Sequence, residues 1–155
     1  GGQCLTLYLH PRDYHRFHTP CAGTVTGFRY VPGEFWTVGS AGVNGVPGLF
    51  ARNERLITYL RTEFGELALV AVGATVVGRI KVVYHDFQSH LPGAVPTALN
   101  LSPAVNLPKG AELGRFELGS TVILLTQPDQ VDLNPFYPGD PVRMGMPIGR
   151  VRSHS

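Results

Sequence analysis

The bond between Gly119 and Ser120 is the first place in this sequence where the residue types suggest chemistry. It precedes a continuous apolar run from Val122 to Leu125. Glycine adopts backbone conformations that other residues resist, and it leaves its own carbonyl unhindered. A serine hydroxyl becomes a nucleophile when a base removes its proton, so Ser120 could then attack the carbonyl of Gly119. The alternative is a glycine bulge at a strand end, followed by a serine that only contacts water. Taken alone, the short motif favours the bulge.

A second group of reactive side chains lies between residues 12 and 20, the most polar segment of the chain. His15 and His18 are three residues apart, and a helical turn would place both imidazoles on one face. Three interpretations are open at this point. A metal site would need a third ligand, which is not nearby in the sequence. Acid–base chemistry near neutral pH suits imidazoles, and a surface loop with ordinary histidines fits the same spacing.

The composition predicts a single β-rich domain that spans residues 1–155. Glycine and proline together make up 32 of the 155 residues (19 and 13), about a fifth of the chain against an average near 12%. Such a content disfavours long helices and favours short strands joined by turns. A chain of this length buries roughly 70% of its unfolded surface in one core.

Charge and cysteine content exclude several classes of protein. The net charge of +2 is too small to indicate a nucleic-acid partner, although it is compatible with an anionic membrane surface. Cys4 and Cys21 are the only cysteines, and their spacing matches neither a zinc ribbon nor a disulfide framework. The apolar runs are shorter than the ~20 residues of a membrane-spanning helix.

Alternating and continuous apolar patterns predict most of the strands. Residues 4–10 alternate between apolar and polar, which predicts a half-buried strand. Residues 55–61 and 66–73 are predicted to form a hairpin whose second strand is buried on both faces. Further strands are expected at residues 24–30, 35–38, 79–84 and in the run up to 125.

The remaining segments predict loops and helical turns. Residues 39–48 are expected to form a glycine-rich loop, with short helical turns at 49–53 and near His15. Residues 85–107 contain three prolines and no clear periodicity, which predicts an irregular segment that could cover a substrate. The fold class expected is mostly β (α+β): two packed antiparallel sheets with a carrier-domain-like, barrel-sandwich character and a few short helices.

Five segments, taken in order, resemble the phosphatidylserine decarboxylases of the bacterial and mitochondrial type. Each motif alone is weak, but together they extend over most of the chain and are specific. They are residues 9–20 (with Asp-Tyr-His-Arg-Phe-His-Thr-Pro at 13–20), 31–33, 49–55, 72–78 and 109–123 (with Leu-Gly-Ser-Thr at 118–121).

The resemblance implies a self-processing proenzyme. Ser120 would attack the carbonyl of Gly119, with His18 as the base for self-cleavage, and the chain would divide into residues 1–119 and 120–155. Ser120 would become a covalent pyruvoyl group, the only cofactor expected, with no metal. This group would form a Schiff base with phosphatidylserine, accept the electrons released with carbon dioxide, and leave phosphatidylethanolamine. His15 is the expected acid or base of the decarboxylation.

The sequence departs from the family at one position that bears on processing. The family uses an aspartate upstream of the tyrosine–histidine–arginine motif, and this sequence has no match to it. We expect His18 to lack the partner that would orient it, which disfavours self-processing by these 155 residues alone. Asp13 is expected instead to hold its own loop through hydrogen bonds to the backbone.

Two further function classes compete with the decarboxylase of phosphatidylserine. A soluble relative could decarboxylate a free amino acid with the same fold. A carrier-like β-sandwich without enzymatic activity would need a modifiable lysine at a hairpin tip, but Lys81 and Lys109 both lack the methionine neighbours typical of such sites. The resemblance further implies a homodimer on a membrane surface, at the cytoplasmic face of a bacterial inner membrane or, in a eukaryote, at the mitochondrial inner membrane.

Overall fold

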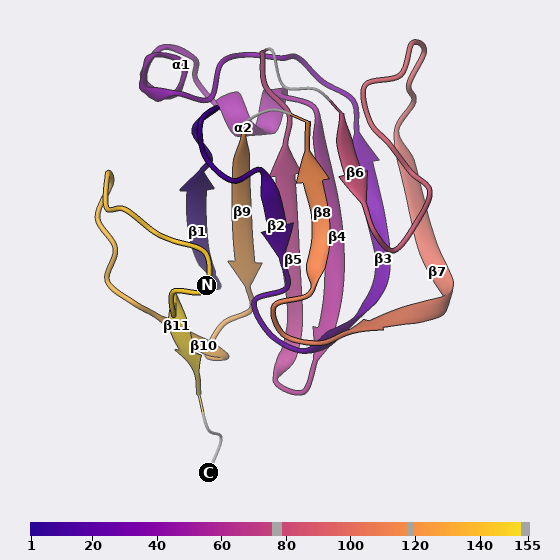
Figure 1. Ribbon diagram of the computed structural model, residues 1–155, viewed down its shortest axis with the longest axis vertical. Helices are drawn as coiled ribbons and strands as arrows, with labels where there is room; N and C mark the ends of the chain where they lie inside the picture. The colour runs from indigo at the N-terminus through magenta and orange to yellow at the C-terminus, as the bar shows by residue number, and fades with distance from the viewer. Residues whose placement is uncertain (76–78, 118–119, 153–155) are drawn as a thin grey trace.

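Antiparallel strands are the main regular structure of the computed structural model, which describes residues 1–75, 79–117 and 120–152 (Figure 1). The largest sheet has six strands in the order β1-β9-β5-β4-β3-β7. In that order the strands are Gln3–Tyr8, Thr121–Thr126, Gly65–Val72, Arg55–Thr62, Gly23–Val31 and Thr97–Leu107.

A smaller sheet packs across one face of the six-stranded sheet (Figure 1). Its order is β2-β8-β6, with bounds Arg16–His18, Glu112–Phe116 and Ile80–Val82. A separate hairpin pairs β10 (Val131–Leu133) with β11 (Gly149–Val151). Apolar side chains of both larger sheets form one core, which confirms the predicted mostly β fold with two packed antiparallel sheets.

The strongest sequence patterns correspond to observed strands. β1 alternates between half-buried and exposed residues, as the period of two predicts. β4 and β5 form the predicted hairpin, with a turn at Glu63 and Phe64. The last four residues of β5, from Leu69 to Val72, are all buried, because this strand lies inside the large sheet with a neighbour on either side.

Two short helices lie near the end of the large sheet where β4 begins. α2 (Leu49–Arg52) confirms the helical turn predicted at residues 49–53. The loop predicted for residues 39–48 was wrong in part, because α1 (Ser40–Gly45) occupies most of it. The helical turn predicted near His15 was also wrong: the chain is extended there and enters β2 at Arg16.

The strand predicted for residues 35–38 is not formed. Apart from a single bridge between Glu34 and Asn53, this segment has no strand partner among the described residues. The side-chain amide of Asn53 takes the place of a partner, accepting a hydrogen bond from the Trp36 N–H at 3.0 Å and donating to the Trp36 carbonyl at 2.8 Å. The residue types at 35–38 favour a strand, but among the described residues no neighbouring strand pairs with them.

The irregular segment predicted for residues 85–107 is irregular only in its first half. Residues 97–107 form β7, the longest strand of the protein, which pairs with β3 at one edge of the large sheet. Every residue of β7 is exposed or half-buried. Its apolar residues nevertheless alternate, at Leu99, Leu101, Val105 and Leu107, a period of two that the prediction overlooked. Residues 85–96 do form a connection without regular structure beyond a single bridge.

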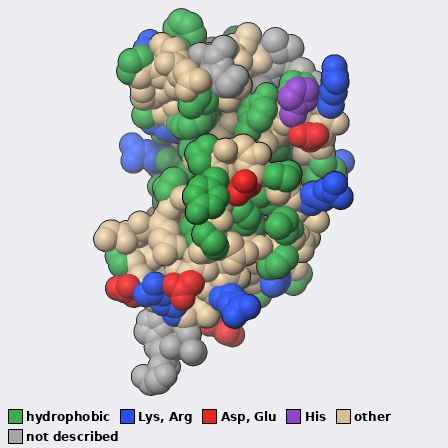
Figure 2. All heavy atoms as spheres, turned by 90° about the vertical axis from the view of Figure 1, so that its left-hand side faces the viewer, with side chains coloured by type: hydrophobic (Ala, Val, Ile, Leu, Met, Phe, Trp, Pro, Cys, Tyr) green, Lys and Arg blue, Asp and Glu red, His purple; other side chains and the backbone are tan. Residues whose placement is uncertain are grey.

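The opposite edge of the large sheet is β1, which pairs with β9 alone. Figure 2 shows this side of the molecule: hydrophobic side chains gather in its middle, and charged ones are concentrated toward the end that carries β10 and β11. Exposed hydrophobic residues of β1, β9 and the 134–148 connection include Tyr8, Leu125, Tyr137, Met144 and Met146.

Candidate functional site

Ser120 is fully buried at the point where the chain enters β9. Its hydroxyl donates a hydrogen bond to the carbonyl of Val72, the last residue of β5. Its own carbonyl accepts a hydrogen bond from the N–H of Leu9 at 2.6 Å, just beyond the end of β1. The serine therefore sits between the ends of two strands, and a backbone carbonyl, which cannot take a proton, orients its hydroxyl.

The loop from Leu9 to His15 is bonded at both ends to the chain around the serine. Leu9 contacts Ser120, and the carbonyl of His15 accepts a hydrogen bond from the N–H of Phe116 at 2.9 Å. The predicted cleavage partner Gly119 falls between these anchors and lies outside the described residues. This arrangement keeps the histidine loop beside Phe116 and Ser120.

Asp13 shapes this loop, as the sequence predicted. Its carboxylate accepts a hydrogen bond from the N–H of His10 at 3.2 Å, and its own N–H donates to the His10 carbonyl at 2.8 Å. These reciprocal bonds close a tight turn at Pro11 and Arg12. Asp13 is therefore a local structural residue.

His15 presents a buried ring nitrogen at the serine end of the molecule. Its Nε2 atom is shielded from solvent and has no hydrogen-bond partner among the described residues. Most buried polar atoms in folded proteins are hydrogen-bonded, so an exception indicates a site where a ligand or a reacting group completes the bonding. The Oγ1 atom of Thr121, next to Ser120, is likewise buried and has no hydrogen-bond partner among the described residues.

His18 lies toward the other end of the small sheet. Its Nδ1 is 2.8 Å from the carbonyl oxygen of Gly110, which can only accept, so Nδ1 carries the proton. In the neutral ring, Nε2 therefore accepts a hydrogen bond from the hydroxyl of Tyr14 at 2.8 Å, and the two rings stack. The sequence alone did not single out Tyr14 for this role.

The structure does not place the two histidines on one face. His18 pairs with Glu112 at the start of β8, whereas His15 bonds Phe116 at its end. Three residues of extended chain put the two histidines about 10 Å apart. Within the part of the chain that the structure describes, the His18 ring forms hydrogen bonds with Tyr14 and Gly110. The role of His18 as the base for self-cleavage stays a prediction.

Asn53 is a buried residue next to the serine that sequence reasoning left without a role. Its side-chain Nδ2 donates to the carbonyl of Gly73 at 2.8 Å, in addition to its two bonds with Trp36. Gly73 directly follows Val72, the acceptor of the Ser120 hydroxyl. Asn53 therefore fixes the peptide that follows the one orienting the serine, and it is completely shielded from solvent. The peptide that orients the serine donates its Gly73 N–H to the Glu54 backbone carbonyl at 2.7 Å.

Glu54 is a buried carboxylate beside this peptide. It accepts hydrogen bonds from the Tyr30 hydroxyl at 2.5 Å, the His90 N–H at 2.9 Å and the Ser89 hydroxyl at 3.1 Å. Within the described residues it has no ion pair, so these three donors alone compensate its burial. Burial and the hydrogen bond to Glu54 raise the pKa of Tyr30 above its ordinary value. An asparagine–glutamate pair directly before a buried strand was the available signal in the sequence.

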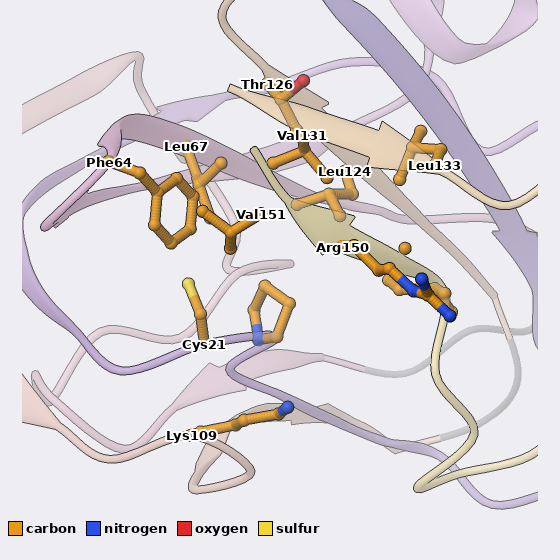
Figure 3. A pocket seen from close by; sticks show the side chains of 13 residues that line it. Cys21, Phe64, Leu67, Lys109, Leu124, Thr126, Val131, Leu133, Arg150 and Val151 are labelled. Atoms are coloured by element: carbon orange, nitrogen blue, oxygen red, sulfur yellow. The ribbon is translucent and has the colours of Figure 1, made fainter. Parts of the chain in front are cut away.

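A cavity of about 340 Å³ lies at the other end of the large sheet (Figure 3). Its walls are mainly apolar and come from β5, β9, β10, β11 and the chain after β2; they include Phe64, Leu67, Leu124, Val131 and Leu133. Cys21 faces it, and burial raises the pKa of the Cys21 thiol. Neither Ser120 nor either histidine lines this cavity, so it is separate from the candidate site.

The described ranges also bear on metal binding and on membrane-spanning helices. Residues 1–75, 79–117 and 120–152 contain no group of three or more histidine, cysteine or acidic side chains arranged to hold a metal ion. In the same ranges, no helix is both long enough and apolar enough to span a bilayer.

Fold and site together define a β-sandwich domain built around a buried serine, with an imidazole nitrogen that lacks a partner at the same end. The family model for phosphatidylserine decarboxylase matches residues 1–150. The chain belongs to the phosphatidylserine decarboxylase family.

Curated relatives agree with this assignment. The chain is 53% identical over 153 residues to a protein of Anaeromyxobacter sp. (strain K) and 49% identical over 152 residues to one of Myxococcus xanthus. Both are named phosphatidylserine decarboxylase proenzyme, and 96% of this chain is covered in each comparison. The chain spans about half the length of these relatives, 54% and 53% respectively.

Proposed function

We propose that this chain forms the catalytic part of a pyruvoyl-dependent phosphatidylserine decarboxylase, which converts phosphatidylserine to phosphatidylethanolamine and carbon dioxide. The observation that carries the proposal is the buried Ser120 hydroxyl, oriented by the Val72 carbonyl at the start of β9. Membership of the family and the name of the relatives support the reaction.

The first step proposed is self-cleavage between Gly119 and Ser120. The Ser120 oxygen attacks the preceding carbonyl, the amide becomes an ester, and elimination separates residues 1–119 from residues 120–155. Burial favours this step because the hydroxyl is shielded from competing water. A base must take the hydroxyl proton, and we propose His18 for this role; it would have to release Tyr14 and approach the serine.

The surroundings of Ser120 fit a pyruvoyl group derived from it. Two buried polar atoms without partners among the described residues, His15 Nε2 and Thr121 Oγ1, belong to this end of the molecule and could bind the carbonyl oxygens of such a group. When formed, the group supplies a ketone that withdraws electrons from the carbon that loses carbon dioxide.

His15 is the proposed acid or base of the decarboxylation. Its Nε2 has no competing partner among the described residues, and imidazoles exchange protons near neutral pH. The loop bonds at Leu9 and Phe116 would hold the ring beside the reacting carbon. His15 would thus move a proton at one atom while the backbone around it stays fixed.

We further propose that the protein acts on a membrane surface as a peripheral homodimer. Phosphatidylserine carries two acyl chains and resides in bilayers, so its decarboxylase must reach a membrane. The proposed location is the cytoplasmic face of a bacterial inner membrane, because the relatives compared above are bacterial.

The intact mass of the denatured protein, before and after treatment with a carbonyl-trapping reagent, tests the proposal. Two fragments divided between residues 119 and 120, the smaller of which reacts as a ketone, are expected. The variant Ser120→Ala should stay as one unreactive chain, whereas the control Ser102→Ala should be cleaved like the natural sequence. A single unreactive species near 16.8 kDa for the natural sequence would contradict self-processing by this chain.

An activity assay distinguishes the two candidate substrates, phosphatidylserine and free serine. Cleaved protein should release carbon dioxide from phosphatidylserine and leave free serine unchanged. Release from free serine alone would support the soluble amino acid decarboxylase instead.

A further inference from the structure

The connection between β6 and β7 ends in an exposed apolar tip. Leu91 and Val95 are 44% and 65% exposed, and the residues between them are proline, glycine and alanine. A turn closes the tip, with the N–H of Ala94 donating to the carbonyl of Leu91 at 3.1 Å. Two large apolar side chains therefore flank a compact turn that has no covering element in the described structure.

The sequence around this tip is unusually free of charge. Residues 87–108 contain no lysine, arginine, aspartate or glutamate, where the chain's average of 15% would give about three. Pro92 and Pro96 also lack backbone N–H groups, which reduces the number of donors that would lose water in an apolar medium. Both properties lower the free energy required to transfer the tip from water into lipid.

The base of the tip is held firmly in the core. The Phe87 ring packs against Phe28 and Tyr30, with ring centres 5.1 Å from each. The Ser89 hydroxyl and the His90 N–H both bond the buried carboxylate of Glu54. The tip is thus displayed on a fixed support, so little conformational entropy would be lost when it binds.

The tip and the serine belong to the same end of the large sheet. β7 begins at Thr97 opposite Tyr30, at the end where β9 begins after Ser120. In Figure 1 the connection rises beyond this end of the sheet. β9 and β7 are separated by three strands in the sheet order, a lateral distance of about 19 Å. A flat surface that touched the tip would therefore lie over the serine end.

We propose that residues 91–96 insert into the surface of a phospholipid bilayer and hold the Ser120 end of the protein against it. The inference rests on the proposed action on a bilayer lipid. A bilayer suits the tip better than a protein partner, because the tip is convex and small, whereas stable protein interfaces bury about 800 Å² on each side. Arg29 is exposed beside Ala98 of β7 and has no acidic partner among the described residues, so it could face the anionic headgroups.

Co-sedimentation with vesicles tests the proposal without requiring any catalytic activity. The vesicles contain phosphatidylcholine and phosphatidylserine in a ratio of 7:3. We expect the natural chain to bind and Val95→Glu to lower the partition into vesicles by about tenfold, because a carboxylate resists transfer into lipid. Val95→Ser, a milder change, should give an intermediate loss and guards against misfolding of the first variant.

Val151→Glu is the matched control. Val151 is also a half-exposed valine, but it lies on β11, away from the serine end. Its substitution should leave vesicle binding unchanged. Equal binding by all variants, equal loss in Val95→Glu and Val151→Glu, or no binding by the natural chain would overturn the proposal. A change from dimer to monomer in Val95→Glu during analytical ultracentrifugation, with vesicle binding unchanged, would assign the tip to a second copy instead.

If the proposed function fails, the results differ from those expected when only the insertion of the tip fails. In that case mass analysis would show neither cleavage at Ser120 nor a ketone, while vesicle binding would still depend on Val95. If cleavage and the ketone are present, Val95→Glu should slow decarboxylation of vesicle phosphatidylserine but not of a short-chain, water-soluble phosphatidylserine. Equal slowing of both substrates would contradict the insertion of the tip.

Discussion

At the end of the six-stranded sheet where β9 begins, the protein buries polar side chains: Asn53, Glu54, Ser89, Ser120 and Thr121 are all at most 1% exposed. At the other end, mainly apolar side chains surround a cavity (Figure 3). Burial of polar groups lowers stability unless hydrogen bonds replace their contacts with water. Among the described residues, the serine end leaves His15 Nε2 and Thr121 Oγ1 without partners, and the cavity end leaves Thr126 Oγ1 and Gln130 Oε1.

The comparison indicates different tasks for the two ends. Asn53 and Glu54 form a bonded framework that fixes the peptide after β5 and the base of the β6–β7 connection. The cavity end contributes apolar contacts without such a framework. Substitutions at the serine end should therefore change chemistry or stability through hydrogen bonds, and those at the cavity end through packing.

The largest effect is expected from His15→Ala. In cleaved protein we expect decarboxylation to fall by about 10²- to 10⁴-fold, the range typical for loss of a general acid or base. Cleavage at Ser120, measured by mass, should be retained. His85→Ala, which removes an exposed histidine elsewhere, serves as the control. Decarboxylation at the natural rate by His15→Ala would show that His15 takes no part in the reaction.

Glu54→Ala should strongly lower the free energy of unfolding. The variant leaves the donors of Tyr30, Ser89 and His90 without an acceptor, and we expect a loss of roughly 3 kcal/mol or more. Glu54→Gln keeps one acceptor oxygen and should lose less. Urea denaturation measures both variants. An unchanged midpoint for Glu54→Ala would show that these bonds do not stabilise the serine end.

Leu67→Ala tests the cavity end. Leu67 is buried and lines the cavity, so truncation should destabilise the fold by about 2 kcal/mol, near the lower limit for leucine. Cleavage at Ser120 should be unaffected, because the residue lies at the opposite end of the sheet. A loss of cleavage in a folded Leu67→Ala protein would contradict the division of tasks between the two ends.

The smallest effect concerns alkaline pH. The pKa of Tyr30 is raised in the folded state from an ordinary value of 10.0, first by burial and then by its hydrogen bond to Glu54. Stability from this group is therefore complete below pH 10 and declines as pH rises above it. Melting temperatures measured between pH 8 and 11 should fall less steeply for Tyr30→Phe. Identical slopes would indicate that Tyr30 does not couple folding to pH.

Local patterns predicted the elements that the sequence marks strongly. The alternation in β1, the paired strands β4 and β5, and the helical turn at α2 all follow from short-range preferences and burial. The Gly-Ser bond beside an apolar strand made Ser120 a candidate, and the resemblance to the family selected the reactive serine over a glycine bulge; that role stays a prediction. The motifs that resemble the family were readable for the same reason: they are contiguous in the sequence.

Other features depend on partners that are distant in the sequence. Residues 35–38 have strand-like residues, but a side chain, Asn53, occupies the position of a neighbouring strand. β7 pairs with β3 at the edge of the sheet, a partner that the alternation of its own apolar residues cannot specify. The residues near His15 are extended because they pair with β8, which lies about 100 residues later.

What the sequence by itself determined is the class of fold and the family, and it predicted the serine proposed to react. Only the tertiary structure decided which polar groups surround that serine. Val72 bonds Ser120 because β5 and β9 are neighbours in the sheet, and Asn53 and Glu54 bond Gly73, the next residue, because β4 pairs with β5. His15 and His18 separate because an extended chain moves about 3.3 Å per residue. Hydrogen bonds between distant segments depend on this assembly, and spacing along the chain cannot specify them.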